Sequence, residues 1–253
     1  MSLEAADHAA VALRRRTFVL RSLCVLVIVL LLADLMRSWM EWLPTRFRLG
    51  IDFQLYVEAT HRWLGGGTFY EPYQVAGPYM VEHGAILYPP FSIPLFAAFT
   101  VLPAVLWWLV PVVSVAAVTL WHRPSLVAWL GIVFCLWFPA TSVKVITGNP
   151  VLWAVAAVAL GTVGGWPAVG ALLKPTLFPF ALIGIRRRSW WVGLFALGLL
   201  SMLFLPLWPD YVQVIRNAQT PEGVLYSVQE APMMAIPIVA WLGGIRFKRQ
   251  PQT

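Results

Sequence analysis

A polar stretch of the chain, residues 51–73, carries side chains that could perform acid–base chemistry. Asp52 and Glu58 could accept a proton, and Arg62 could pair with an anion. A carboxylate beside basic and aromatic groups can take a proton from a sugar hydroxyl, and Tyr56 could offer a flat face to a sugar ring. We therefore take Asp52 as the candidate general base, and Tyr56, Glu58 and Arg62 as candidate binding residues.

The same stretch also has a purely structural interpretation. Apolar residues at helical spacing predict a helix over 52–64, which Gly65-Gly66-Gly67 would end. Asp52 would then cap the helix N-terminus, and Glu58 and Arg62 would form a surface pair four residues apart. Both interpretations remain open at this point.

Two lysines in apolar segments are the next candidates for binding. A lysine inside a hydrophobic run costs on the order of 3 kcal/mol on insertion, so it suggests a function. Pro175 would break the helix directly after Lys174 and let its ammonium face a cavity, where it would suit a phosphate group. The alternative is that Lys174 extends to the nearer membrane interface. Lys144 begins the turn expected at residues 144–149.

Polar groups near these lysines could contact a substrate. Asn149 offers both a donor and an acceptor to a hydroxyl, and Tyr88, before two prolines, could form one wall of a site. The chain has no Asp-x-Asp pair, and neither His61 nor His83 lies at metal-ligand spacing from another candidate ligand. We therefore predict no metal and no cofactor.

The composition indicates what kind of protein must position these groups. The 253 residues are 60% hydrophobic and only 11% charged, with a mean hydropathy of +0.75. Such a chain cannot cover a water-soluble globule with charge, and its long apolar runs approach the ~20 residues that cross a bilayer. Cys24 and Cys135 lie inside apolar runs and predict no disulfide framework.

The net charge of +7 does not point to nucleic acid. Its basic clusters stand at the edges of apolar runs, which is the pattern of cytoplasmic loops in membrane proteins. We therefore expect a lipid bilayer as partner and no nucleic acid. The clusters are Arg14–Arg16, Arg186–Arg188 and Arg246–Arg249.

We predict an all-α, polytopic transmembrane protein with about seven to eight membrane helices. Two of the expected segments are difficult to assign as membrane spans. Residues 91–102 are too few to cross a bilayer alone, and 166–185 is broken by prolines. The remaining candidate spans are 18–39, 104–121, 125–141, 150–163, 189–208 and 231–245.

Two arrangements of these spans compete. If both difficult segments are simple spans, Arg123 lies outside and the turn at Asn149 inside. If 91–102 is a half-helix and 166–185 forms two half-helices that meet near Lys174, every basic cluster lies inside. The positive-inside rule favours the second arrangement.

The expected organisation is a single transmembrane domain in a bacterial cell membrane. A cytoplasmic tail (1–17) precedes the domain (18–245), whose first apolar run we interpret as an uncleaved anchor. Two polar segments, 41–88 and 209–230, form the outer loops and hold most of the acids. A second cytoplasmic tail (246–253) follows.

Four short motifs follow one another along the chain: Asp52-Phe53-x-x-Tyr56, Gly67-Thr68-Phe69-Tyr70, Tyr88-Pro89-Pro90 and Leu173-Lys174-Pro175. In this order they resemble the motifs of bacterial GT-C glycosyltransferases, and more narrowly those of the mycobacterial-type polyprenol-phosphate-mannose-dependent α-mannosyltransferase family. Gly148-Asn149 matches the family's Gly-Gln turn only in part. The resemblance covers about residues 18–208. Such enzymes are much longer and have further spans toward the C-terminus, so this chain would be a short or degenerate member.

The resemblance implies a function and roles for individual residues. A hexose, mannose by this likeness, would move with inversion from a polyprenyl-phosphate donor to a hydroxyl of a glycolipid or glycan acceptor at the outer face. Asp52 would deprotonate the acceptor, while Lys174, helped by Arg62 or Lys144, would stabilise the leaving lipid phosphate. No nucleotide-binding fingerprint is expected, because a lipid carries the sugar.

Two other classes of function fit parts of the sequence. A small-solute transporter would also use broken helices and a midplane lysine, although the chain shows no repeated halves. The short length favours a catalytically inactive membrane scaffold.

Overall fold

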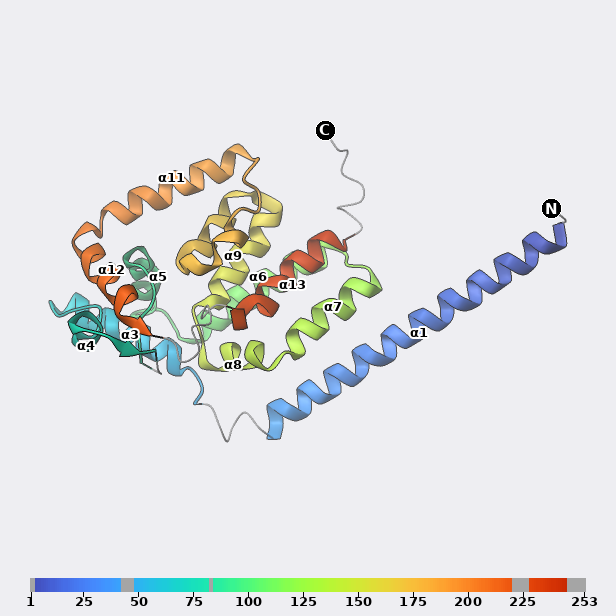
Figure 1. The fold of residues 1–253 in the computed structure, drawn as a ribbon, viewed down its shortest axis with the longest axis horizontal. Helices are drawn as coiled ribbons and strands as arrows, with labels where there is room; N and C mark the ends of the chain where they lie inside the picture. Colours follow the sequence, from blue (N-terminus) through green and yellow to red (C-terminus); the bar gives the residue numbers. More distant parts are fainter. Residues whose placement is uncertain (1–2, 42–47, 82–83, 220–227, 245–253) are drawn as a thin grey trace.

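The computed structural model describes residues 3–41, 48–81, 84–219 and 228–244. His83, the whole C-terminal tail 246–253 with its basic cluster, and part of the second polar loop lie outside the described residues. The described chain is predominantly helical, as the sequence predicts (Figure 1). It also contains one two-stranded sheet, which the sequence does not predict.

Helix α1 (Leu3–Glu41) is long and lies along one side of the molecule (Figure 1). Its segment Arg14–Glu41 is apolar enough to cross a membrane and is not buried by the rest of the chain. Near its C-terminal end, Trp137 Nε1 donates a hydrogen bond to Asp34 Oδ2 over 2.9 Å, and Trp39 Nε1 donates one to Ser142 Oγ over 3.0 Å. These bonds hold α1 against the rest of the molecule, and α1 also packs against α7 (Leu126–Trp137).

The first polar loop folds into a small subdomain with an aromatic core. Gln74 is fully buried and accepts a hydrogen bond from Ile86 N, while Asn217 donates to Gln74 O over 2.9 Å. The loop therefore packs against the segment near residue 217, and the two predicted outer loops form one unit. Its elements are α3 (Ile51–Leu64), α4 (Pro72–Ala76), strand β1 (Tyr79–Met80), α12 (Trp208–Asn217) and strand β2 (Ala218–Gln219), which pairs in parallel with β1.

A bundle of apolar helices forms the second part of the molecule (Figure 1). Leu152, Val155 and Met234 are among the buried residues of its core. Helices α7 and α8 meet at an angle of 62°, where Pro139 begins α8. The bundle consists of α6 (Val105–His122), α7 (Leu126–Trp137), α8 (Pro139–Thr147), α9 (Val151–Gly164) and α13 (Ala231–Leu242).

The two difficult segments do not form simple helices that cross the molecule. Residues 91–102 give only a short 3-10 turn and the six-residue helix α5 (Ile93–Ala98). Residues 166–185 break at Lys174, which is extended, as Pro175 predicts. The pieces on its two sides are η2 (Trp166–Leu173), η3 (Pro175–Leu177) and α10 (Phe178–Ala181).

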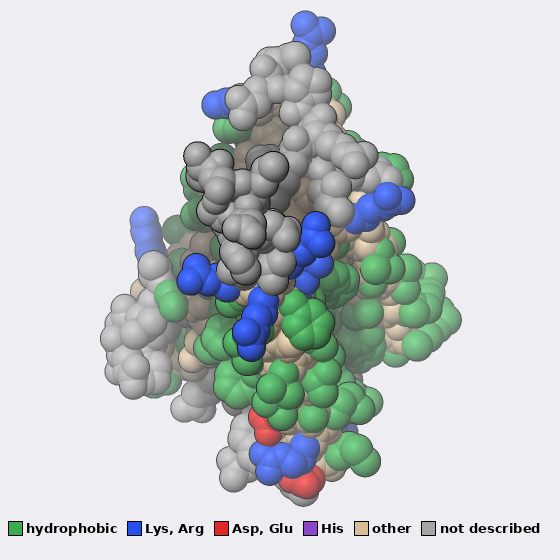
Figure 2. Space-filling view, turned by 90° about the vertical axis from the view of Figure 1, so that its right-hand side faces the viewer, with side chains coloured by type: hydrophobic (Ala, Val, Ile, Leu, Met, Phe, Trp, Pro, Cys, Tyr) green, Lys and Arg blue, Asp and Glu red, His purple; other side chains and the backbone are tan. Residues whose placement is uncertain are grey.

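The number of membrane-crossing helices is smaller by length and composition than the sequence predicts. Among the described residues, two helices qualify, Arg14–Glu41 and Val105–His122, or up to four if each bent pair is one span. The second bent pair joins α11 (Arg188–Met202) to η4 and α12. Figure 2 shows broad hydrophobic surface on one face of the molecule, with acidic side chains at its lower edge. This surface is consistent with a protein embedded in lipid.

Contacts at the two ends of the bundle show which predicted segments lie together. At one end, Asn149 donates a hydrogen bond to Asp52 over 2.8 Å. At the other end of α9, Thr162 contacts His122, the residue before Arg123, and Val163 O accepts from Arg187. The first arrangement separates Asp52 from Asn149 by the membrane, whereas the second puts them on one face; the topology itself stays a prediction.

Candidate active site

The Asp52 carboxylate is the centre of a hydrogen-bonded cluster. Its Oδ2 accepts from Thr147 Oγ1 and from Asn149 Nδ2, each over 2.8 Å. The prediction that Asp52 caps helix α3 is wrong, because the helix begins at Ile51 after Gly50 and has no side-chain cap. The carboxylate instead faces the turn that follows α8.

Backbone and tryptophan contacts fix that turn against α3. Gly50 N donates to Ile146 O over 2.8 Å, while Trp107 and Trp108 on α6 donate to Gly148 O and Val145 O, each over 2.7 Å. Gly148 has a φ of 68°, and a Cβ there would lie 2.7 Å from the Trp108 ring. Only glycine fits both the conformation and the space.

Tyr88 orients the Asn149 side chain. The Tyr88 hydroxyl donates to Asn149 Oδ1 over 3.1 Å, and Val151 N donates to the same oxygen. Because the amide oxygen accepts both bonds, the amide NH₂ is the group that faces Asp52. The structure therefore brings Tyr88 and Asn149, two of the predicted binding residues, together beside Asp52.

A second charged cluster lies beside the first and joins the two predicted lysines. Lys174 Nζ lies 2.5 Å from Glu230 Oε1, and Lys144 Nζ lies 3.7 Å from the same oxygen. Glu230 is fully buried, and the Lys174 side chain is 6% exposed. Lys174 therefore faces the protein interior and does not extend to an interface.

Helix α8 connects the two clusters. Lys144 and Thr147 are three residues apart, so they lie on neighbouring positions of one helix face. Lys144 reaches Glu230, while Thr147 reaches Asp52. The Lys174 ammonium also interacts electrostatically with Lys144 and Asp52. Two carboxylates and two ammonium groups thus share one buried region, whose formal charges sum to zero.

Three of the predicted binding residues, Arg62, Glu58 and Tyr56, do not belong to either charged cluster. Arg62 forms an ion pair with Glu71 over 2.8 Å and donates to the Thr68 carbonyl, so it closes the glycine loop. It lies ten residues after Asp52 in α3, or about 15 Å along the axis. The predicted Glu58–Arg62 pair is therefore wrong, and Glu58 is exposed without a hydrogen bond or ion pair to any described residue.

Tyr56 is a core residue and not an open platform for a sugar. It is 4% exposed, and its ring stacks on Phe96 with centroids 4.8 Å apart. It also meets the Tyr88 ring edge-on at 5.0 Å. Tyr56 therefore supports the wall that holds Tyr88 in place.

Sequence reasoning missed two members of the site. Glu230 counted only as one acid of the second outer loop, and Thr147 was not considered. The position of Glu230 directly before the apolar run of α13 could have indicated it, because two lysines in apolar segments require a nearby acid. Thr147 carries no comparable indication.

A cavity of about 470 Å³ is lined in part by Leu173, the residue before Lys174. It is almost entirely apolar and lies between α9, η2 and α11. Among its other lining residues are Phe91, Trp153 and Leu200. The Lys174 side chain itself is buried against Glu230.

Comparisons with known proteins do not identify a family for this chain. No protein-family model, curated protein or solved structure matches it. Within the described residues, no group of three or more His, Cys, Asp or Glu side chains is placed to hold a metal ion. The function must therefore be argued from the site itself.

Proposed function

We propose that the protein is a membrane glycosyltransferase that moves a hexose, mannose by the motif resemblance, from a polyprenyl phosphate to an acceptor hydroxyl. The transfer inverts the anomeric centre. The acceptor is a glycolipid or glycan at the outer face of the cell membrane. In this proposal the chain crosses the membrane about seven to eight times, in the second arrangement, with both termini in the cytoplasm.

One observation carries the proposal, namely a hydrogen-bonded carboxylate next to one buried lysine, Lys174, and one partly buried lysine, Lys144. Asp52 accepts two hydrogen bonds through Oδ2, which leaves Oδ1 available for the acceptor proton. The bonds hold the carboxylate in one orientation, as a general base requires. Lys144 and Lys174 lie near enough to stabilise charge that develops on a leaving phosphate.

Glu230 acts in this proposal as the counter-ion of the two lysines before a donor binds. Two buried ammonium groups without an acid would be strongly destabilising. The carboxylate of Glu230 therefore occupies the place where a donor phosphate would bind. Its Oε2 has no hydrogen-bond partner among the described residues, so part of the carboxylate is held only by charge. Binding of the phosphate would displace Glu230 from at least one lysine.

The apolar cavity beside Leu173 supports a lipid-linked donor. Its lining would accept a polyprenyl chain, and its position would leave the attached phosphate near Lys174. A nucleotide donor would require a polar, Gly-rich phosphate loop instead, and the sequence contains no such fingerprint.

The test is transfer from radiolabelled polyprenyl-phosphate mannose to a glycolipid acceptor in membranes that contain the protein. Asp52→Asn should abolish transfer while expression and thermal unfolding stay near those of the wild type. Glu58→Gln is the matched control, because it removes an exposed acid from the same helix. It should transfer at the wild-type rate.

Two results would contradict the proposal. Equal transfer by wild type and Asp52→Asn would exclude Asp52 as the base. No transfer with any lipid-linked sugar, combined with uptake of a labelled solute into vesicles, would favour a transporter. The buried Lys174–Glu230 pair at a helix break is the feature that such a transporter would share.

A further inference from the structure

Two loops cross closely at the end of α9 that lies away from Asp52. Gly165 follows α9 with a φ of 81°, and Gly184 lies so near that a Cβ on it would be 2.8 Å from Gly165 Cα. Ser189 Oγ donates to Gly164 O over 2.8 Å, and Arg187 donates to Val163 O. The crossing therefore fixes the start of α11 against the end of α9.

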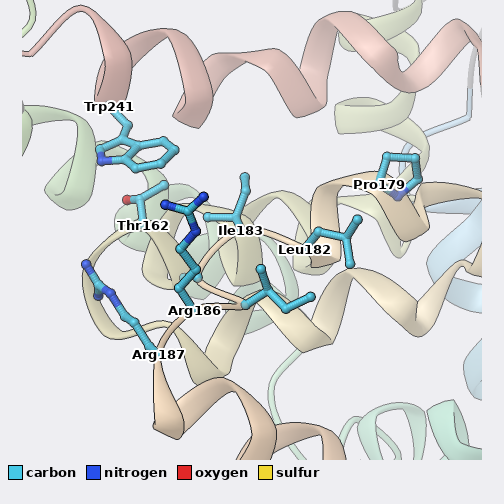
Figure 3. A pocket seen from close by; sticks show the side chains of 10 residues that line it. Thr162, Pro179, Leu182, Ile183, Arg186, Arg187 and Trp241 are labelled. Carbon is cyan, nitrogen blue, oxygen red and sulfur yellow. The ribbon is translucent and has the colours of Figure 1, made fainter.

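A cavity of about 490 Å³ lies beside this crossing, and arginines border it (Figure 3). In Figure 3 the Arg186 side chain extends toward Trp241 of α13 and Thr162 of α9. Leu182 and Ile183 form part of its apolar wall. The volume falls within the range of ligand pockets, about 300–1,000 Å³.

The charge at this cavity is positive and uncompensated. Among the described ion pairs, none involves Arg186 or Arg187. Arg187 is held by the Val163 carbonyl, whereas Arg186 is exposed at the cavity. A planar guanidinium with free donors binds phosphate oxygens in pairs. The chemistry therefore favours a phosphate group.

The surface next to the cavity is apolar. Helix α11 begins at Arg188 and exposes Trp191, Val192 and Phe195 within its first turns. A ligand with its phosphate at Arg186 could therefore lay apolar chains along α11. A free phosphate would leave this surface unused, so the observations favour a lipid.

We propose that the cavity between Thr162, Arg186 and Trp241 binds the phosphate-bearing headgroup of an anionic phospholipid. Basic pockets between membrane helices at the cytoplasmic side recognise such headgroups. The site lies at the other end of α9 from Asp52 and Asn149, so it is separate from the proposed transfer site and does not depend on it. It anchors this end of the protein in the membrane.

The test measures lipid binding to the purified full chain in a neutral detergent by native mass spectrometry. The probes are dioleoyl phosphatidylglycerol, dioleoyl phosphatidylcholine and inorganic phosphate. The wild type should bind phosphatidylglycerol at least about fivefold more tightly than phosphatidylcholine, as one basic residue near an anionic headgroup implies. Arg186→Gln should remove most of this preference, and Arg186→Lys should keep part of it.

Arg188→Gln is the matched control, because it removes the same charge two positions away, outside the cavity lining. It should keep the lipid preference within about twofold of the wild type. Equal losses in Arg186→Gln and Arg188→Gln would overturn the site in favour of diffuse attraction. A wild type that does not distinguish the two lipids would also overturn it, even if Arg186→Gln failed to fold. Inorganic phosphate that displaces bound phosphatidylglycerol at equal concentration would overturn the assignment to a lipid.

Discussion

Replacing Glu230 with Gln should strongly destabilise the protein. Glu230 Oε1 lies 2.5 Å from Lys174 Nζ and 3.7 Å from Lys144 Nζ, and the carboxylate is fully buried. At an effective dielectric constant of about 20, the closer pair attracts by roughly 6–7 kcal/mol. Desolvation of the charges offsets part of this attraction. Removal of one partner of a buried pair typically costs 3–5 kcal/mol, and we expect a loss of about 3–5 kcal/mol here.

The assay is a double-mutant cycle of unfolding free energies in mixed micelles, with denaturing detergent as the perturbant. Lys174→Met alone should also destabilise, because it leaves Glu230 paired only with the more distant Lys144. The double variant Glu230→Gln/Lys174→Met should be less destabilised than the sum of the single variants by about 2 kcal/mol or more. Single-variant losses below about 1 kcal/mol, or losses that add without coupling, would refute a buried ion pair that contributes to stability.

Further predictions concern the turn, the tyrosines and the pH. Gly148→Ala should destabilise the fold by about 1–3 kcal/mol and lower transfer, because a Cβ would meet Trp108 at a positive φ; unfolding and transfer assays check this. Tyr88→Phe should cost about 1 kcal/mol of unfolding free energy and slow transfer, since Asn149 loses its hydroxyl donor. Burial raises the pKa of Tyr70, so the folded state favours the neutral phenol. Tyr70 therefore contributes fully to the free energy of unfolding below the ordinary tyrosine pKa, and this contribution is lost as the pH rises above about 10. Tyr70→Phe should flatten that alkaline loss of stability in a pH series of unfolding measurements, and an unchanged slope would contradict the assignment.

Much of the architecture could be predicted because apolar runs and prolines act locally. The end of α3 at Leu64 and the break at Lys174 both follow from the residue types beside them. The membrane-crossing lengths were harder to predict, because α7 and α8 bend at Pro139 and the segment 91–102 gives only a short helix. The hydropathy of a segment depends on its composition, so it does not predict the angle at which the chain bends within that segment.

The site could be predicted only where a residue type is costly in its surroundings. Lys174 could be predicted as a site residue because it stands in an apolar segment, and Asp52 because of the residue types around it. Arg62 looked equally suitable for binding a phosphate, but its guanidinium pairs with Glu71 and with a carbonyl of the glycine loop instead. Glu230 is missed because its partners are 56 and 86 positions away in sequence, and no local pattern records such a pairing.

The ion-pair cluster also has a consequence for the order in which the chain assembles. Lys144 and Lys174 leave the ribosome well before Glu230, which directly precedes α13. Until that acid arrives, both ammonium groups lack their buried partner and favour the aqueous edge of the bilayer. The segment around Lys174 should therefore settle into its final depth only after α13 has inserted. Synthesis arrested before residue 230 should leave the thiol of an Ala171→Cys variant, three positions before Lys174, open to water-soluble reagents. The chain that includes Glu230 and α13 should protect it, because Ala171 is fully buried there.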